Sequence, residues 1–250
     1  MPHITSQSDL NAPVDVVNRA YESFASWRAD RDAAVTAPTG NLALVETRWL
    51  PAAGPRASEI ADEQPPGVRV SDVKRIDPDT GETEVGLRFW DADSAAIRSF
   101  ETIDAFPFAP EWVVTAHFTP VDAERTVPFE HIRDNGGTRD LVVPGDISVT
   151  LGGEKYTLSA FDDNGTLLLV FGDLTNRSQE PPDATYPAGR FLHIPTELDR
   201  GETGTVVLDF NRAFIPPCGF SPHYNCPLPP AQNRINLAVT AGEKSVLTSA

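Results

Sequence analysis

The chain has 250 residues, of which 40% are hydrophobic and 22% charged; this composition is typical of a globular protein and excludes an intrinsically disordered one. Its 36 acidic residues outnumber its 20 basic residues, so the net charge is −16, and such a surface repels nucleic acid and anionic lipid. The sequence has neither an apolar run of about 18 residues nor a secretory signal pattern, so we expect a soluble cytoplasmic protein that binds neither nucleic acid nor a membrane.

The first predicted element is an amphipathic helix within residues 12–40. Apolar side chains recur at helical spacing, at Val17, Tyr21, Phe24 and Trp27. Asn11 can cap this helix, and Pro13 suits its first turn. We expect the helix to pack across a sheet, with Phe24 and Trp27 buried.

Short strands joined by turns follow the helix. Alternating apolar residues bounded by Gly, Asn and Asp predict strands at 42–50, 68–76, 82–90, 112–118, 139–143, 147–151, 154–161, 166–172, 191–194, 205–210 and 235–240. No helical pattern alternates with them. The fold class we expect is therefore all-β, a mainly antiparallel sandwich or barrel with one N-terminal packing helix.

The sequence indicates the division into domains less clearly than it indicates the strands. We expect a β unit at 41–125 and a second one at 126–250, with a boundary in the loop region around 120–138. A single domain is the alternative.

Polar residues concentrate in one C-terminal segment, residues 204–244. Asp209, Asn211 and Arg212 stand where a predicted strand ends. The proline-rich stretch 215–230 that follows can be ordered only if it packs tightly, because its backbone groups need partners. A rigid, irregular and polar segment of this kind is typical of the lining of a ligand-binding pocket.

The same segment carries a family resemblance. LDFNRA at 208–213, PPC at 216–218, CPLPP at 226–230 and AGEK at 241–244 resemble the signature of domain of unknown function 1684. WRADRD at 27–32, GDLT at 172–175 and AGRFL at 188–192 are also similar to that family, and the likeness spans about residues 20–244. It implies an all-β fold and supplies no activity, substrate or cofactor. Ile215 departs from the family's usual Asn, and PPDA is inserted before Thr185.

Four charged residues of this region could act together: Arg190, Asp209, Arg212 and Glu243. One interpretation is a structural network of ion pairs between strands. The other is a pocket in which arginine anchors a carboxylate or phosphate, Asp209 or Glu243 serves as an acid or base, and Tyr186 closes over the ligand. In that case we expect the four to converge on one cavity.

Two cysteines allow three interpretations. Cys218, His223 and Cys226 could hold zinc if His193 or Asp209 supplied a fourth ligand, but this spacing is a weak metal motif. A disulfide and a pair of buried thiols are the alternatives. Because prolines stiffen the chain between them, we expect the two cysteines to lie close together.

Three classes of function remain, since no common catalytic motif is present. The favoured one is a small-molecule-binding protein whose pocket is lined by Tyr186, Arg190, Asp209, Asn211 and Arg212. A hydrolase- or isomerase-type enzyme that uses the same pocket and a protein-interaction module on residues 42–118 are the alternatives. The scattered acidic residues and the near absence of Lys favour a surface adapted to salt, and a halophilic or a high-GC source would explain both observations. Neither a cofactor nor an oligomeric state is indicated.

Overall fold

The computed structural model describes residues 11–50, 54–77, 80–122, 124–132, 138–163, 165–180, 182–196, 198 and 201–249. Antiparallel strands are the commonest regular structure among these residues, and one long helix lies at the N-terminal end. The expected all-β class with a packing helix is confirmed.

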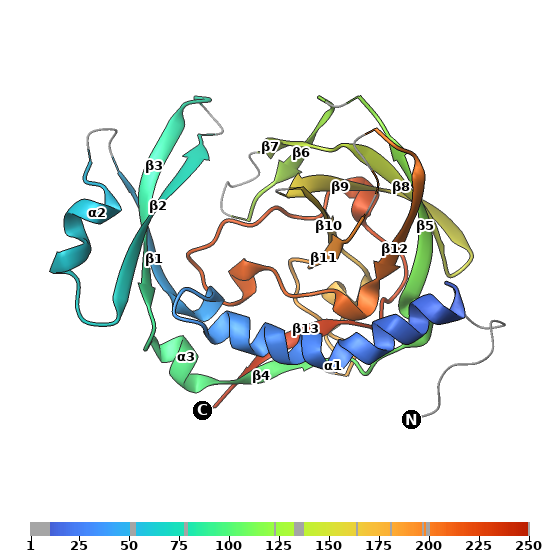
Figure 1. Ribbon diagram of the computed structural model, residues 1–250, viewed down its shortest axis with the longest axis horizontal. Helices are drawn as coiled ribbons and strands as arrows, with labels where there is room; N and C mark the ends of the chain where they lie inside the picture. Colours follow the sequence, from blue (N-terminus) through green and yellow to red (C-terminus); the bar gives the residue numbers. More distant parts are fainter. Residues whose placement is uncertain are drawn as a thin grey trace.

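The largest sheet has six antiparallel strands in the order β11-β10-β9-β8-β5-β12. These strands are β5 (Val113–Pro120), β8 (Gly145–Leu151), β9 (Glu154–Asp163), β10 (Thr166–Phe171), β11 (Arg190–Ile194) and β12 (Gly204–Asp209). The sheet curls into a half-barrel, so that its two edge strands, β11 and β12, approach each other (Figure 1). Among the described residues, no hydrogen-bonded ladder closes this seam.

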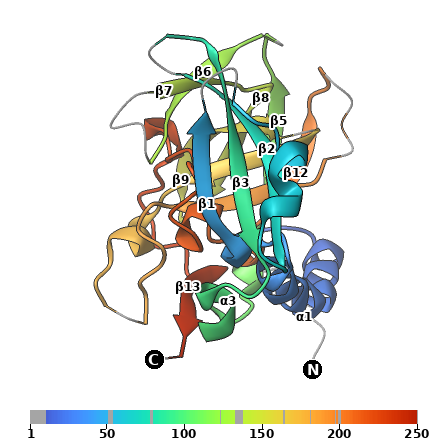
Figure 2. The same ribbon diagram turned by 90° about the vertical axis from the view of Figure 1, so that its left-hand side faces the viewer.

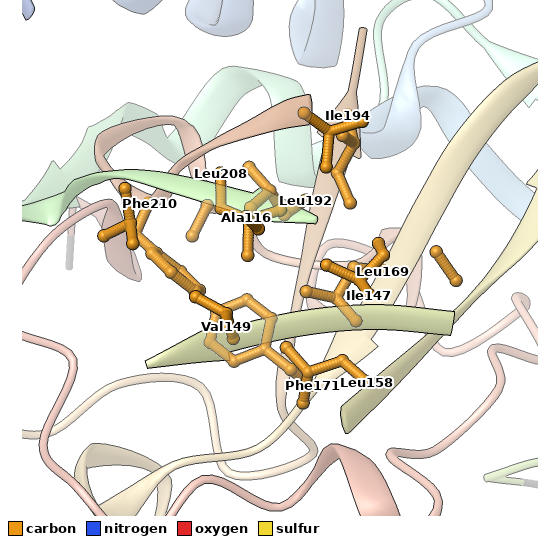
Figure 3. Close-up of a cluster of buried hydrophobic side chains, with 14 of the residues drawn as sticks. Ala116, Ile147, Val149, Leu158, Leu169, Phe171, Leu192, Ile194, Leu208 and Phe210 are labelled. Atoms are coloured by element: carbon orange, nitrogen blue, oxygen red, sulfur yellow. The ribbon is translucent and has the colours of Figure 1, made fainter. Parts of the chain in front are cut away.

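Apolar side chains fill the inside of the half-barrel. Alternation along each strand sends every second residue inward, and the inward residues of all six strands point toward one another (Figure 3). On β12, Val206 and Leu208 are buried in this way, which leaves Val207 and Asp209 on the outer face.

Three smaller sheets surround the half-barrel. The first has the order β1-β3-β2 and stands beside the half-barrel (Figures 1 and 2); its strands are β1 (Leu44–Leu50), β2 (Val68–Ile76) and β3 (Thr83–Asp91). The two-stranded sheets pair β4 (Phe100–Ala105) with β13 (Glu243–Thr248), and β6 (Thr126–Glu130) with β7 (Thr138–Val142). The short helix α2 (Ala57–Ile60) packs on one face of the first sheet through Ala57, Leu87 and Phe89.

The long helix α1 (Val14–Thr36) runs along one side of the molecule (Figure 1). Val17 packs on Val113 of the half-barrel, and Val35 packs near Ile103 of β4. The expected cap is wrong, because the Asn11 amide donates to the Glu111 carbonyl at 2.7 Å instead.

The remaining helical elements are short. Ser94 caps α3 (Ala95–Ser99) by accepting a hydrogen bond from the Ile97 amide. Single 3-10 turns occupy Asn41–Ala43, Ala61–Glu63, Pro110–Trp112, Leu174–Arg177, Phe210–Arg212, Pro217–Gly219 and Ala231–Asn233. None of the helices in the described part of the chain combines the length and apolar character needed to cross a membrane.

One predicted strand is absent for a non-local reason. Residues 235–240 form no strand, because Ile235 and Val239 seal the half-barrel and their amides bond to the Gly172 carbonyl and the Asp173 carboxylate. The six-stranded sheet contains strands from both sides of residue 125, since β5 precedes that position while its partners β8 and β12 follow it.

Candidate functional site

Asn211 is a structural clamp. Its amide group accepts a hydrogen bond from the Ala109 amide at 2.8 Å and donates to the Ala109 carbonyl at 3.0 Å. It also donates to the Asp209 carboxylate at 3.0 Å, and the side chain is fully buried. Asn211 therefore fixes the loop before β5 to the end of β12 and does not face a cavity.

Arg190 is also buried. Its guanidinium bonds to the Asp173 carboxylate at 2.7 Å and to the Val239 carbonyl at 2.8 Å, and both charged side chains are inaccessible to solvent. A hydrogen bond to the Ala241 carbonyl adds a third partner. The expectation that Arg190 presents its charge to an open cavity is wrong: the charge holds the segment 239–241 against β11.

Glu243 is the centre of a second buried cluster of ion pairs and hydrogen bonds, which joins β13 to α1. Its carboxylate accepts hydrogen bonds from Arg31 at 2.7 and 3.1 Å and from the Ile215 amide at 2.8 Å. Arg28 lies 3.8 Å away. Ile215 contributes its backbone N–H to this cluster, and its side chain is buried beside Val35 and Ile103.

The cysteines lie next to each other, as expected. The Cys218 amide donates to the Cys226 sulfur at 3.2 Å, and the two are not joined in a disulfide. A hydrogen bond with the Cys218 thiol, together with burial, raises the pKa of Cys226. The Tyr186 hydroxyl lies 3.6 Å from the Cys218 sulfur, so Tyr186 packs on the proline-rich loop, which was the alternative to closing over a ligand.

The zinc interpretation gains no geometric support. The His223 amide donates to the Ser221 hydroxyl, and its side chain lines a separate cleft that includes neither cysteine. Within the described ranges, no group of three or more His, Cys, Asp or Glu side chains is placed to share a metal ion.

Asp209 and Arg212 do line a cavity together. It is a groove of about 940 Å³ between α1 and the seam where β11 and β12 approach. We call it the seam groove, and its lining includes Val16, Arg19, Ala20, Ser23, Trp27, His193, Leu198, Val207, Asp209, Arg212 and Phe214. Of the four charged residues expected to converge, two meet here and the other two belong to the buried ion pairs.

The polar groups of the seam groove are fixed by their neighbours. The Arg212 Nε lies 3.2 Å from Asp209 Oδ2, and its Nη2 donates to the Ser23 hydroxyl of α1. Asp209 Oδ1 accepts from the Asn211 amide and side chain. Burial raises the pKa of Asp209, and these hydrogen bonds and the charge of Arg212 offset only part of that effect.

His193 lies on the opposite wall and is half-exposed. Burial lowers the pKa of His193, the charge of Asp163 opposes this change, and the charge of Arg31 adds to it. Its ring stacks at a tilt on Phe214, with centroids 5.1 Å apart. A neutral imidazole at neutral pH follows, since the ordinary pKa is already about 6.5.

Sequence reasoning missed the contribution of α1. The expectation that Phe24 and Trp27 are buried is only partly met, because both are half-buried; Trp27 lines the seam groove, and Phe24 packs on Phe108. Val16, Ala20, Ser23 and Trp27 recur at helical spacing and line the groove. Their mixture of a polar, a small and an aromatic residue on one helix face was the available signal, since a packing face would be uniformly apolar.

The chain is similar to a family of proteins and to a solved structure. A family model described as "Protein of unknown function (DUF1684)" matches residues 98–244. A solution NMR structure of an uncharacterized protein from Haloarcula marismortui is 31% identical, with a TM-score of 0.47, and the match covers 58% of this chain and 77% of that one. No curated protein matches the chain.

Proposed function

The chain belongs to the DUF1684 family, and we propose that it binds a small molecule with an apolar body and one anionic group in the seam groove. The observation that carries this proposal is the meeting of Asp209 and Arg212, two charged residues of the family signature, on a groove of about 940 Å³. Ligand cavities are typically about 300–1,000 Å³.

The lining supports an apolar ligand body. Trp27 and Val16 on α1 face Val207 on β12 and Phe214 across the groove. Trp27 is only half-buried although it stacks on Phe24 with ring centroids 6.1 Å apart. Covering this exposed apolar surface would favour binding by about 25 cal/mol for each Å² removed from water.

Arg212 supports an anionic end group. A guanidinium carries five N–H donors in a fork that matches a carboxylate, and the contacts with Asp209 and Ser23 occupy two of them. The side chain is 33% exposed. Its position is fixed from both sides of the groove before a ligand arrives, which lowers the entropy cost of binding.

An enzyme is the second candidate, favoured by the raised pKa of Asp209. A carboxyl group that stays protonated at higher pH is suited to act as a general acid. However, Asp209 Oδ1 is held by Asn211 and Oδ2 by Arg212. We therefore place binding ahead of catalysis.

The binding proposal is tested by thermal denaturation with a panel of small aromatic and aliphatic carboxylic acids and their neutral amides. A ligand at a hundred times its dissociation constant stabilises the native state by about 2.7 kcal/mol, which for a chain of this length raises the midpoint by about 5–10 °C. We expect at least one acid to do so and its amide to do so less.

Matched variants locate the site. Arg212→Gln should abolish the shift, and Arg98→Gln, which removes an arginine from an exposed ion pair with Asp93, should leave it unchanged. A shift that persists in Arg212→Gln, or a panel in which no acid is better than its amide, would contradict the proposal.

We also propose that the protein works in the cytoplasm of a halophile, with support only from composition: a net charge of −16 and Lys at three positions. Screening of like charges should then stabilise the native state. The unfolding midpoint should rise with KCl up to molar concentrations, and a midpoint that falls with salt would count against this proposal.

A further inference from the structure

A second cleft lies between the three-stranded sheet and the C-terminal part of the chain, and it has a volume of about 300 Å³. We call it the basic cleft. Arg75 from β2, Arg88 from β3 and Arg139 from β7 line it, together with His131, His223 and Trp49. It shares no lining residue with the seam groove.

Strand register explains why these arginines gather. Arg88 is directly opposite Thr47 on β1 and Ser71 on β2, so their side chains share one face of the sheet. Arg75 lies two pairs further along β2 on that same face. The opposite face carries Leu87 and Phe89 and is covered by α2. Arg75 and Arg88 therefore share the face that lines the cleft, together with Glu84, which is directly opposite Arg75.

The charge of the basic cleft contrasts with that of the whole protein. Among its described lining residues none is Asp or Glu, although the chain has 36 acidic residues and a net charge of −16. Arg75 pairs with Glu84 at its edge, and Arg139 donates to the Ile76 carbonyl. Arg88 Nε is buried and has no hydrogen-bond partner in the described structure.

Aromatic rings hold two of the guanidinium groups in place. Arg75 lies over Trp49, with 4.1 Å from its central carbon to the ring centroid, and Arg88 lies over Tyr224 at 5.3 Å. Stacking of this kind fixes the plane of a guanidinium while its N–H groups stay available at the edge. The donors are thus oriented before any ligand arrives.

The loop that carries His223 is fixed as well. The Thr47 hydroxyl donates to the His223 carbonyl at 3.0 Å, and the Ser221 hydroxyl donates to the Leu44 carbonyl at 2.6 Å. On the far wall, His131 is 8% exposed, and its Nδ1 lies 3.1 Å from the Phe129 carbonyl. Because a carbonyl only accepts, Nδ1 is the donor in this hydrogen bond.

We propose that the basic cleft binds a phosphate-type oxyanion, either inorganic phosphate or the phosphate group of a small phosphorylated molecule. The cleft brings Arg88 and Arg139 together with Arg75, whose charge is shared with Glu84, and a bound dianion would stabilise this group of cations. Arginine forks also match phosphate geometry. The volume is at the lower end for ligand sites, so it suits a phosphate with a small organic group at most.

Isothermal titration calorimetry at neutral pH and constant ionic strength tests this proposal, with inorganic phosphate and glycerol phosphate as probes. We expect saturable binding with a millimolar or lower dissociation constant. Tighter binding of glycerol phosphate would identify a phosphorylated small molecule as the source, and tighter binding of inorganic phosphate would identify the free ion. Both results support the phosphate chemistry.

Variants place the anion. Arg88→Gln and Arg139→Gln should each weaken binding by about tenfold or more, as expected for a lost charge-assisted hydrogen bond, whereas Arg98→Gln should not. Arg212→Gln in the seam groove should also leave phosphate binding unchanged, which separates this proposal from the previous one.

Two outcomes would overturn the proposal. One is the absence of saturable heat from both probes up to tens of millimolar in the wild type. The other is an unchanged affinity in Arg139→Gln, which decides the matter if circular dichroism shows that Arg88→Gln does not fold.

Discussion

The replacement Asp173→Asn probes the buried ion pair between Asp173 and Arg190 with no change in side-chain size. Asp173 accepts hydrogen bonds from Arg190 at 2.7 Å, from the Thr175 amide at 2.7 Å and from the Val239 amide at 3.3 Å. Each of these partners is a donor. The amide –NH₂ of an asparagine would therefore face a donor whichever way it turned.

The expected cost follows from burial. Both side chains of the pair are inaccessible to solvent, and Arg190 Nε already has no hydrogen-bond partner in the described structure. Removing one partner of a buried ion pair costs about 3–5 kcal/mol, because the other charge is left uncompensated. For a chain of this length the melting midpoint should fall by about 6–20 °C.

Urea denaturation and calorimetry measure this loss, with Asp93→Asn as the matched control. Asp93 pairs with Arg98, but the two side chains are 82% and 58% exposed, so the same chemical change there should cost less than about 1 kcal/mol. Equal and small losses in the two variants would refute the conclusion that the Arg190 charge holds the fold together.

Two further predictions concern ionisation. Because Asp209 has a raised pKa in the folded state, that state binds more protons than the unfolded one as pH rises from the ordinary carboxyl range to the raised pKa. The free energy of unfolding of the wild type should therefore fall across this window relative to Asp209→Asn; a constant or rising difference in parallel urea titrations would contradict the shift. Because a hydrogen bond with Cys218 and burial raise the pKa of Cys226 and the thiolate is the reactive form, iodoacetamide should label Cys226 slowly in the native protein. The labelling rate is measured by mass spectrometry, and a rate in the native protein equal to that in urea would contradict the prediction.

Local pattern was sufficient for most strands. Alternating residues and turn chemistry predict β2 with its observed bounds, Val68–Ile76, and the hairpin at Gly152 and Gly153, whose φ angles of 57° and 85° favour glycine. Both signals act over a few residues.

The pairing of strands that are far apart in the sequence could not be predicted from local pattern. The pair β4 and β13 joins residues about 140 positions apart, and nothing in either segment alone specifies the other. The apolar run at 235–240 looks like a strand because its side chains are buried, but its backbone partners are a carbonyl and a carboxylate from a distant loop.

The candidate site shows the same limit. Charge type alone grouped Arg190 and Glu243 with Asp209 and Arg212, while the true partners of the first two are Asp173 in GDLT and Arg31 in WRADRD. Both motifs are visible in the sequence. Only the packing of α1 and β10 against the C-terminal segment shows which charges neutralise each other.

The most direct test of the central claim is an NMR titration of the isotopically labelled protein with an anilinonaphthalene sulfonate dye, an apolar molecule with one anionic group. We predict that the chemical-shift changes concentrate on the groove face of α1 around Ser23 and Trp27, on the end of β11 and on β12 near Asp209, and that they disappear in Arg212→Gln. Changes that map elsewhere on a folded protein, or that survive in Arg212→Gln, would contradict the seam groove as the binding site.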